Sequence, residues 1–600
     1  MSWLGTVRKI NLSADTFNRH AKLVSIRKPQ SHRGFRGDGG HPHTPALAGL
    51  RFRTSHTGFR METKLLMLVY VSLFVVLGFI TLPKYGFTWD EGVGDVFFGE
   101  RYFHFFTSLN PAYLNFENPD LDVHHRPFNV YSSSYRDKPN EFPPVGNTFS
   151  GMTMELFGYR LGWLDPVDAF HLGKVLLSGL LLWVLFNFAA PRLGTLAAGL
   201  AVLILSTFPR FWGDMHFNPL DLPEAIFGAL TLFAFYFWSE RPSWKRAGLV
   251  GILMGCALGS KGTSHFIPLI LLLGLFPFAS IPRLWKPATE HLRKYLGHYL
   301  LMIGIAVLLF FFEWPYFYAD PWSHLQTYYN FILTEGYTRG TTEWNWDPLV
   351  QAITTMPEID LVLLIVGIGS AIRGILKSKS RLLQLLLAWL AVPILRASLP
   401  GAANFDGIRH FEEFVPAACL LAGYGGASLV GLATRLTGRK GLAAAGLVAL
   451  LVLNLAWIEA RYFSYEHLYY NSLVGGLGGM QRINPDATDY WGGSYRQGGQ
   501  WLNYNAEREA QVHVAIAPWI VKLTAPLWLR SDIGLIEEPV VRLKVEQGYP
   551  VYVMFITRPG WYNSIATFSV QNLKPVHQIT VDGATILVIY KLDDPKGIPN

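Results

Sequence analysis

Residues 64–82 read KLLMLVYVSLFVVLGFITL, and no charged residue follows Lys64 within this stretch. A run of about 20 mainly apolar residues is long enough to cross the hydrocarbon core of a bilayer as a helix. The acidic pair Asp90-Glu91 follows eight residues after the run ends. The sequence therefore predicts a membrane span that leads directly to two carboxylates at the membrane surface.

Apolar runs of similar length recur through the middle of the chain and predict a polytopic α-helical membrane protein. If the N-terminus is cytoplasmic, the short inside loops hold fifteen Lys and Arg, and the four short outside loops hold four. Because Lys and Arg crowd the cytoplasmic loops of membrane proteins, residues 83–171, 210–221, 315–357 and 460–600 are predicted to lie outside. We expect about eleven spans, near residues 64–82, 172–190, 193–209, 222–238, 246–260, 264–282, 297–314, 358–376, 381–396, 412–433 and 441–459.

The composition excludes several other classes of protein. Half of the 600 residues are hydrophobic and only 16% are charged, which is unlike a disordered chain or a cytosolic enzyme. Two cysteines cannot build a disulfide framework or a four-thiolate zinc site. The net charge of +8 arises in residues 1–60, which carry +9, so the remaining residues carry −1. The basic balance therefore gives no reason to expect a nucleic-acid partner.

Three regions are predicted. Residues 1–63 form a basic, disordered cytoplasmic tail, with translation from Met61 as an alternative. Residues 64–459 form the transmembrane domain, which includes the long first outside loop 83–171. Residues 460–600 contain β-rich runs separated by Gly, Pro and Asn, so we expect a small α/β domain outside the membrane. Its predicted strands are residues 512–517, 540–545, 551–556 and 585–590.

The predicted outside face carries acids close to the membrane. Asp90 and Glu91 open the first outside loop, and acids at the mouth of a span are functional candidates because their burial is costly. Asp90 could equally cap the helix that starts at Glu91. The loop before residue 222 adds Asp214 and Asp221, and Asp221 could also be a helix cap. His216 could bind a divalent metal together with Asp214 or Asp221.

Three cations share this face with the acids. They are Arg210, Lys261 in the turn Gly259-Ser260-Lys261, and Arg409. A lone lysine can meet a phosphate as a point charge, whereas Arg409 could simply extend to the membrane interface. Carboxylates can accept a proton from a hydroxyl group, and cations can stabilise a departing phosphate. The set suits an anionic, lipid-borne substrate handled at the membrane surface.

Four stretches in this order resemble polytopic glycosyltransferases of the GT-C fold, and within them glycosyltransferase family 39. That family includes protein O-mannosyltransferases and lipid A aminoarabinose transferases. The similar stretches, which cover roughly residues 64–460, are Asp90-Glu91, Glu141-Phe142-Pro143-Pro144-Val145-Gly146, the segment from Pro209-Arg210 through His216 to Asp221, and Gly259-Ser260-Lys261. Some relatives have Lys before the Pro-Pro pair, where this chain has Phe142, and Lys138 lies four residues upstream.

The resemblance implies transfer of one sugar, with inversion, from a polyprenyl-phosphate carrier to a lipid, glycan or protein acceptor on the non-cytoplasmic side. It implies Asp90 as the base or acceptor-orienting group, Glu91 as its neighbour, and Asp221 as a residue that shapes the site. Lys261, Arg210 or Arg409 would meet the phosphate, and Lys138, Glu141, Asp214 and His216 are further substrate-binding candidates. No cofactor is certain, and a divalent metal is possible. The expected location is the bacterial inner membrane.

Two other functional classes remain open from the sequence. A lipid or sugar transporter, or a flippase, also needs many spans, but it predicts repeats and ionisable groups at mid-membrane. No repeat is evident, and the charges gather at one face. A non-catalytic envelope scaffold, with residues 460–600 as its binding module, would leave the acids of the first loop without a role other than capping.

Overall fold

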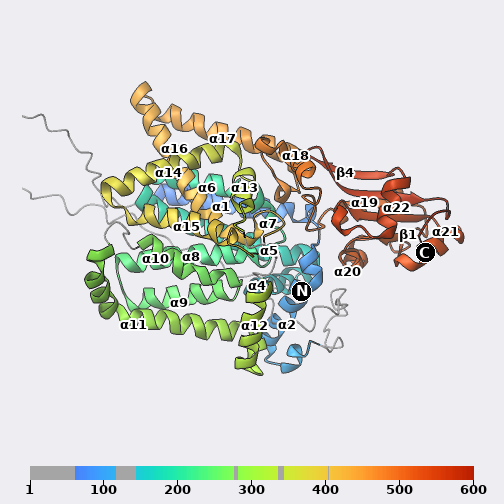
Figure 1. The fold of residues 1–600 in the computed structure, drawn as a ribbon, viewed down its shortest axis with the longest axis horizontal. Coiled ribbons are helices and arrows are strands. Elements are labelled where there is room, and N and C mark those ends of the chain that lie inside the picture. The colour runs from blue at the N-terminus through green and yellow to red at the C-terminus, as the bar shows by residue number, and fades with distance from the viewer. Residues whose placement is uncertain (1–60, 117–142, 276–280, 336–342, 403, 600) are drawn as a thin grey trace, which may run out of the picture. The chain divides into compact units, whose positions relative to one another are not determined.

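A helical membrane part precedes a small domain with a five-stranded sheet (Figure 1). The computed structural model describes residues 61–116, 143–275, 281–335, 343–402 and 404–599. Of the predicted tail, only residues 61–63 are described, and they begin helix α1.

Each of the eleven apolar runs contains a helix. The helices are α1 (Met61–Thr81), α5 (Pro166–Leu193), α6 (Thr195–Ser206), α8 (Asp221–Glu240), α9 (Trp244–Leu258), α10 (Ile267–Leu275), α11 (Ile281–Glu313), α14 (Glu358–Ser378), α15 (Arg381–Ala397), α16 (Val415–Thr437) and α17 (Lys440–Tyr462).

The predicted count of eleven spans is not confirmed. Among the described residues, seven helices are long and apolar enough to cross a membrane, namely α1, α5, α8, α11, α14, α16 and α17. The other four, α6, α9, α10 and α15, are 12, 15, 9 and 17 residues long. Transmembrane helices have roughly 17 to 25 residues, so these four lie at or below the lower limit and their crossing stays a prediction. The chain is nevertheless an integral membrane protein, because seven helices have the length and hydropathy of spans.

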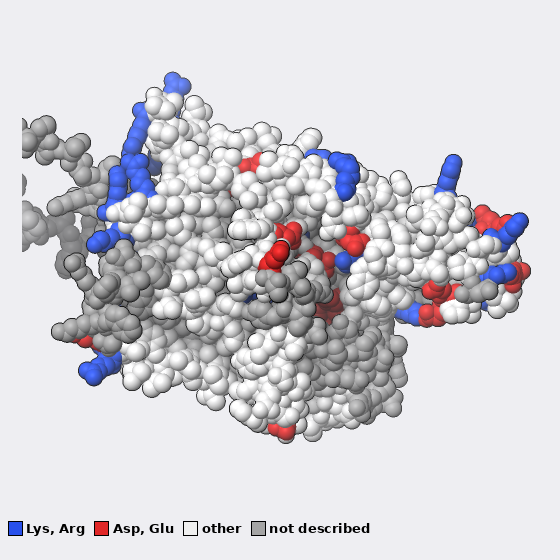
Figure 2. Space-filling model, in the orientation of Figure 1, with Lys and Arg blue, Asp and Glu red and all other residues white. Residues whose placement is uncertain are grey.

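The spanning helices divide into an inner and an outer set. The most apolar stretches of α5, α8 and α16 are 78%, 72% and 67% buried, whereas those of α1, α11, α14 and α17 are 22%, 17%, 28% and 11% buried. Apolar side chains on the outer set are free to contact lipid. On the face drawn in Figure 2, the helical part carries few charges along its length, and Lys and Arg gather around the turn between α16 and α17.

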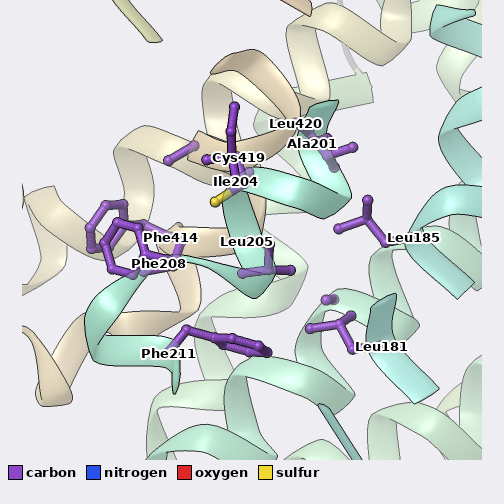
Figure 3. Packing of buried hydrophobic residues seen from close by; sticks show 14 of the residues in the cluster. Leu181, Leu185, Ala201, Ile204, Leu205, Phe208, Phe211, Phe414, Cys419 and Leu420 are labelled. Carbon is purple, nitrogen blue, oxygen red and sulfur yellow. The ribbon is translucent and has the colours of Figure 1, made fainter. Parts of the chain in front are cut away.

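The core of the membrane part lies where α5, α6 and α16 meet. Leu181 and Leu185 of α5, Ile204 of α6 and Leu420 of α16 are all fully buried in it (Figure 3). Small residues allow the helices to approach closely. A Cβ atom on Gly367 of α14 would lie 1.9 Å from the carbonyl oxygen of Leu421 in α16.

Shorter helices lie between the spans. They are α2 (Val96–Ser108), α4 (Val145–Thr153), α7 (Pro209–Asp214), α12 (Pro321–Glu335) and α13 (Asp347–Thr354). Of these, α2 packs against α4, and α7 follows α6 directly. In the chain, α2 follows Asp90 and Glu91, α4 follows Glu141, and α7 ends at Asp214.

The sheet of the C-terminal domain has the strand order β2-β1-β3-β5-β4. β1 pairs in parallel with β2 and β3, and β5 pairs antiparallel with β3 and β4. The strands are β1 (Gln511–Val514), β2 (Gly534–Ile536), β3 (Val551–Ile556), β4 (His577–Val581) and β5 (Ala584–Leu592), and the helices are α18 (Gly476–Ile483), α19 (Tyr495–Asn505), α20 (Pro518–Trp528), α21 (Val541–Glu546) and α22 (Ser564–Asn572). This confirms a mixed α/β domain.

One predicted strand, residues 540–545, is wrong, because Val540 ends a 3₁₀ turn and Val541–Glu546 form helix α21. Val541 and Val545 are buried, while Leu543 is 49% exposed. Residues four apart share a helix face, so the run is amphipathic with a helical period. The apolar residues Val541, Leu543 and Val545 alternate along the chain, so this short run also matches the period of a strand.

The C-terminal domain shares its core with residues that lie between α1 and α5 in the chain. Phe87, Val96 and Met154 belong to the same buried cluster as Ile516 of the C-terminal domain and Val553 of β3. Side chains that share one dry core are held in fixed relative positions. The domain therefore packs directly on the loop that carries Asp90, and its boundary at residue 460 stays a prediction.

Candidate functional site

Four charged side chains from four separate segments meet in one cluster. Asp90 precedes a π-helical turn (Glu91–Asp95), Asp221 begins α8, Lys261 precedes a 3₁₀ turn, and Arg409 begins another. Arg409 Nη2 donates to Asp90 Oδ2 at 3.0 Å, and its Nε lies 3.7 Å from Asp221 Oδ2. Lys261 Nζ donates to Asp221 Oδ1 and to the carbonyl oxygen of Arg409. Two carboxylates thus alternate with two cations.

The cluster is partly exposed to solvent. The side chain of Asp90 is 26% exposed, compared with 6% for Asp221. Figure 2 shows that acidic side chains gather on this view where the helical part meets the C-terminal domain. Burial raises the pKa of Asp90, the charge of Arg409 opposes that rise, and Asp221 and Asp406 add to it. A reachable carboxylate with a raised pKa is a better proton acceptor than an ordinary aspartate.

Neither acid of the cluster is a helix cap. Asp90 makes no side-chain capping hydrogen bond to the turn that follows it. At the start of α8, Asn218 Oδ1 accepts hydrogen bonds from the backbone N–H groups of Leu220 and Asp221, at 3.3 and 2.9 Å. Asn218 also donates to Asp221 Oδ2 at 2.9 Å. Asn218 therefore does the capping, and the Asp221 carboxylate is left to face Lys261 and Arg409.

Trp491 of the C-terminal region contacts both sides of the Asp90–Arg409 pair. The guanidinium of Arg409 lies 4.4 Å from the centre of the Trp491 ring. The carbonyl oxygen of Trp491 accepts a 2.7 Å hydrogen bond from the backbone N–H of Trp89, the residue before Asp90. Arg409 is thus held by an aromatic face and a carboxylate, and it does not extend to the membrane interface.

The turn that presents Trp491 is held by a buried carboxylate. Asp489 accepts hydrogen bonds from the backbone N–H groups of Gly492 and Ser494, at 2.9 and 2.7 Å. His467 lies 3.5 Å from it. Burial opposes ionisation, but these donors and His467 hold the pKa of Asp489 below its usual range. Gly492 has a φ of +78°, and a Cβ there would lie 2.6 Å from Ile520, so glycine is required.

Glu91 lies apart from the open cluster, in a sealed one. Its carboxylate lies 2.9 Å from His171 Nε2 and 3.6 Å from Lys174 Nζ, and all three side chains have no exposed surface. The backbone N–H of Thr88 donates to it at 2.9 Å. Burial raises its pKa, but the charges and hydrogen bonds of these partners lower it further than burial raises it. Glu91 therefore anchors the turn behind Asp90.

Arg210 and Asp214 form a buried layer beside the open cluster. Arg210 is 1% exposed, and it donates to Tyr490 Oη at 3.4 Å and to the carbonyl oxygen of Tyr469 at 3.3 Å. Burial raises the pKa of Asp214 to about 7 despite the opposing charge of Arg210. Both side chains lie near the open cluster but are covered by the protein.

The His216 side chain is buried and makes structural contacts with its neighbours. Its ring stacks on Tyr85, with centroids 3.7 Å apart, and hydrogen-bonds to Thr81 Oγ1 at 2.9 Å and to the carbonyl oxygen of Trp212 at 2.8 Å. Burial lowers its pKa to about 3. Within the described ranges, no group of three or more His, Cys, Asp and Glu side chains is placed to hold a metal ion.

Two predicted site residues, Lys138 and Glu141, lie outside the described residues. Four that were predicted come together, namely Asp90, Asp221, Lys261 and Arg409. Residue-by-residue reading missed other members of the neighbourhood: Trp89, His171, Lys174, Asp406 and Trp491. Of these residues, only Trp491 could have been noticed in the sequence. It lies in the stretch Asp489-Tyr490-Trp491-Gly492, which has paired aromatic residues followed by a glycine.

A second acidic layer lies deeper in the membrane part. Glu224, one turn after Asp221 in α8, accepts a 3.1 Å hydrogen bond from Ser264. Glu413, one turn after Arg409, accepts from Arg396 at 2.7 Å. Both acids are buried and have polar partners, as buried acids require.

Residues 141–314 match the family model described as dolichyl-phosphate-mannose-protein mannosyltransferase. This segment contains the Pro-Pro stretch, the Pro209-to-Asp221 motif and the turn at Lys261. The match confirms the resemblance to GT-C glycosyltransferases in this part of the chain. No curated protein matches the chain.

Several solved structures are similar to this one. The crystal structure of ArnT from Cupriavidus metallidurans bound to undecaprenyl phosphate has a TM-score of 0.47 and 15% identity, covering 88% of this chain and 98% of that chain. The oligosaccharyltransferase of Archaeoglobus fulgidus, in its apo form, has a TM-score of 0.42 and 13% identity over 83% of this chain and 70% of its own. The arabinofuranosyltransferase AftD from Mycobacteria has a TM-score of 0.39 and 13% identity over 89% of this chain and 40% of its own.

Proposed function

We propose that this protein is a membrane glycosyltransferase that moves a sugar from a polyprenyl-phosphate carrier to an acceptor hydroxyl, with inversion. The observation that carries the proposal is the cluster of Asp90, Arg409, Asp221 and Lys261, in which a reachable carboxylate lies beside two cations. The family model that matches residues 141–314 supports the same reaction class.

Asp90 acts as the general base. Its carboxylate accepts the proton of the acceptor hydroxyl while that oxygen bonds to the anomeric carbon of the donor sugar. The bond between this carbon and the phosphate oxygen breaks, and the polyprenyl phosphate leaves with the electron pair. A single displacement from the face opposite the phosphate inverts the anomeric configuration.

Lys261 and Arg409 receive the phosphate. Their side chains are 19% and 13% exposed, so both are within reach of a ligand at the cluster. In a site sheltered from water, preorganised cations stabilise the charge that develops on a leaving phosphate. Asp221, held by Asn218, keeps the two cations in place when no donor is bound.

The site is proposed to lie on the non-cytoplasmic side, with the C-terminal domain and the first outside loop. The excess of Lys and Arg in the opposite loops supports this orientation. It places the N-terminus in the cytoplasm, and in a bacterial cell it makes the protein an inner-membrane enzyme of the cell envelope.

The experiment is a transfer assay on the full chain with a panel of polyprenyl-phosphate sugars, read as release of the free carrier. We expect one donor to release the carrier in an acceptor-dependent manner. Asp90→Asn should lower that rate by about 10² to 10⁴ fold, because it removes the base. The matched control is Asp593→Asn, whose side chain is 78% exposed and far from the cluster in the sequence.

Two outcomes would contradict the proposal. One is an Asp90→Asn variant that transfers sugar at nearly the wild-type rate while remaining folded. The other is movement of the lipid-linked sugar across a vesicle membrane without release of the carrier, which would identify a flippase.

A further inference from the structure

Three tryptophans pack together at Trp89, the residue before Asp90. Trp519 lies in α20, and Trp561 ends a short 3₁₀ turn of the C-terminal domain (Pro559–Trp561). The ring of Trp89 lies 5.1 Å from that of Trp519 and 5.3 Å from that of Trp561, both edge to face. Such pairs hold aromatic rings in fixed orientations.

Trp561 is the exposed member of the group, at 56% of its surface. Tryptophan is common at the edges of spanning helices, where it marks the membrane interface. Trp561 does not belong to such a helix, since it follows β3 of the sheet domain. Trp561 is not an isolated surface residue, because its ring packs edge to face on Trp89, the residue before Asp90, and still leaves more than half of its surface exposed to a ligand.

A charged pair flanks this indole. Arg558 Nη2 donates to Asp406 Oδ1 at 3.1 Å, and the guanidinium carbon of Arg558 lies 5.9 Å from the Trp561 ring centre. Asp406 lies close enough to Asp90 to raise its pKa, so this pair and the open cluster are neighbours. The pair has no net charge, and it offers both hydrogen-bond donors and acceptors.

We propose that Trp561, supported by Trp89 and flanked by Arg558 and Asp406, binds a sugar ring of the acceptor beside Asp90. The proposal rests on the function proposed for Asp90, and it names the acceptor class as carbohydrate. The C–H face of a sugar ring is apolar and fits an indole face, while its hydroxyl groups need both donors and acceptors. A pair without net charge favours a neutral glycan over an anionic headgroup.

The position of Trp561 assigns this ring to the acceptor and not to the donor. A lipid-linked donor remains anchored in the bilayer, so its phosphate approaches from the spanning helices, where Asp221 begins α8 and Lys261 follows α9. Trp561 approaches Asp90 from the sheet domain. Donor and acceptor would then meet from opposite sides of the base.

The test measures binding of the full, detergent-purified chain to a printed panel of neutral glycans, with peptides and phospholipids printed alongside and no donor present. We expect glycan binding that Trp561→Ala weakens by roughly tenfold and that Trp561→Phe partly restores. Tyr504→Ala, which removes an aromatic ring that is 88% exposed in the same domain, is the matched control and should bind like the wild type.

Binding is measured without a donor, so the wild-type chain should bind glycans even if no sugar transfer is detected in the transfer assay. This separates the two proposals, because glycan binding does not depend on the chemical step. The inference is overturned if the chain binds only peptides or phospholipids, if it binds nothing, or if Trp561→Ala binds glycans as the wild type does. In a transfer assay, Trp561→Ala should raise KM for the acceptor and leave KM for the donor unchanged; the reverse result would assign the ring to the donor.

Discussion

Asp90 and Glu91 are neighbours in the sequence but lie in opposite surroundings. Asp90 lies in an open cluster, is 26% exposed and pairs with Arg409. Glu91 lies in a sealed cluster with His171 and Lys174, and none of the three side chains is exposed. The π-helical turn that begins at Glu91 directs consecutive side chains to different sides. The comparison shows that one acid of the pair is available for chemistry while the other fixes its position.

The largest effect is expected from breaking the sealed cluster. Glu91→Gln leaves the buried Lys174 ammonium without a carboxylate, which should cost about 3–5 kcal/mol of stability. Asp90→Asn, at the partly exposed position, should cost less than about 1 kcal/mol. Thermal unfolding of both variants in detergent compares them directly.

A second-site change sharpens this result. Lys174→Met, added to Glu91→Gln, removes the orphaned charge and should recover part of the lost stability. Equal unfolding temperatures for Glu91→Gln and Asp90→Asn would show that the two acids do not differ as described.

A smaller effect is expected from Trp491, whose ring covers Arg409 of the open cluster. Trp491→Leu removes the ring that covers Arg409 and should lower kcat/KM by about tenfold. Trp528→Leu is the matched control, because Trp528 covers Arg496 at 4.1 Å, away from Asp90. Per folded molecule, we expect the control to keep the wild-type kcat/KM. A loss of the same size in both variants would mean that Trp491 acts only through stability.

The smallest effect is expected in the pH dependence of kcat/KM. In the proposed mechanism the carboxylate form of Asp90 is the active one, so activity should fall as the pH drops through its raised pKa. Arg409 lowers this pKa and Asp406 raises it. Arg409→Gln should therefore move the acidic limb to higher pH, and Asp406→Asn should move it to lower pH. Shifts in the same direction would exclude Asp90 as the titrating base; Arg192→Gln, at the pair with Glu240, should shift nothing.

Much of the fold follows from local patterns in the sequence. Each apolar run contains a helix. Inside a bilayer the backbone N–H and C=O groups of an apolar segment must pair with each other, and a helix pairs them within one segment. The hydropathy pattern does not determine whether a given helix crosses the membrane. The four shorter helices, α6, α9, α10 and α15, look like spans in hydropathy, but their described lengths of 12, 15, 9 and 17 residues leave it unconfirmed that they cross.

The candidate site is predictable only in part. Asp90, Asp221, Lys261 and Arg409 stand out because each lies at the end of an apolar run, and ends on one side of a membrane can meet. The pairing of Asp90 with Arg409, 319 residues apart, has no local signal. Arg210 and His216 look equally suitable in the sequence, but contacts with Tyr490 and Tyr85 bury them.

By itself, the sequence determined that the chain is a polytopic helical membrane protein, because hydropathy and charge act residue by residue along the chain. It also determined that acids and cations gather at the ends of the helices, since the hydrocarbon core excludes charge. Only the tertiary structure decided which of these groups face one another, which are sealed, and that Trp491 and Trp561 contact Trp89, the neighbour of Asp90. Those contacts join segments hundreds of residues apart, and they depend on how the helices and the sheet domain pack, which no local pattern encodes.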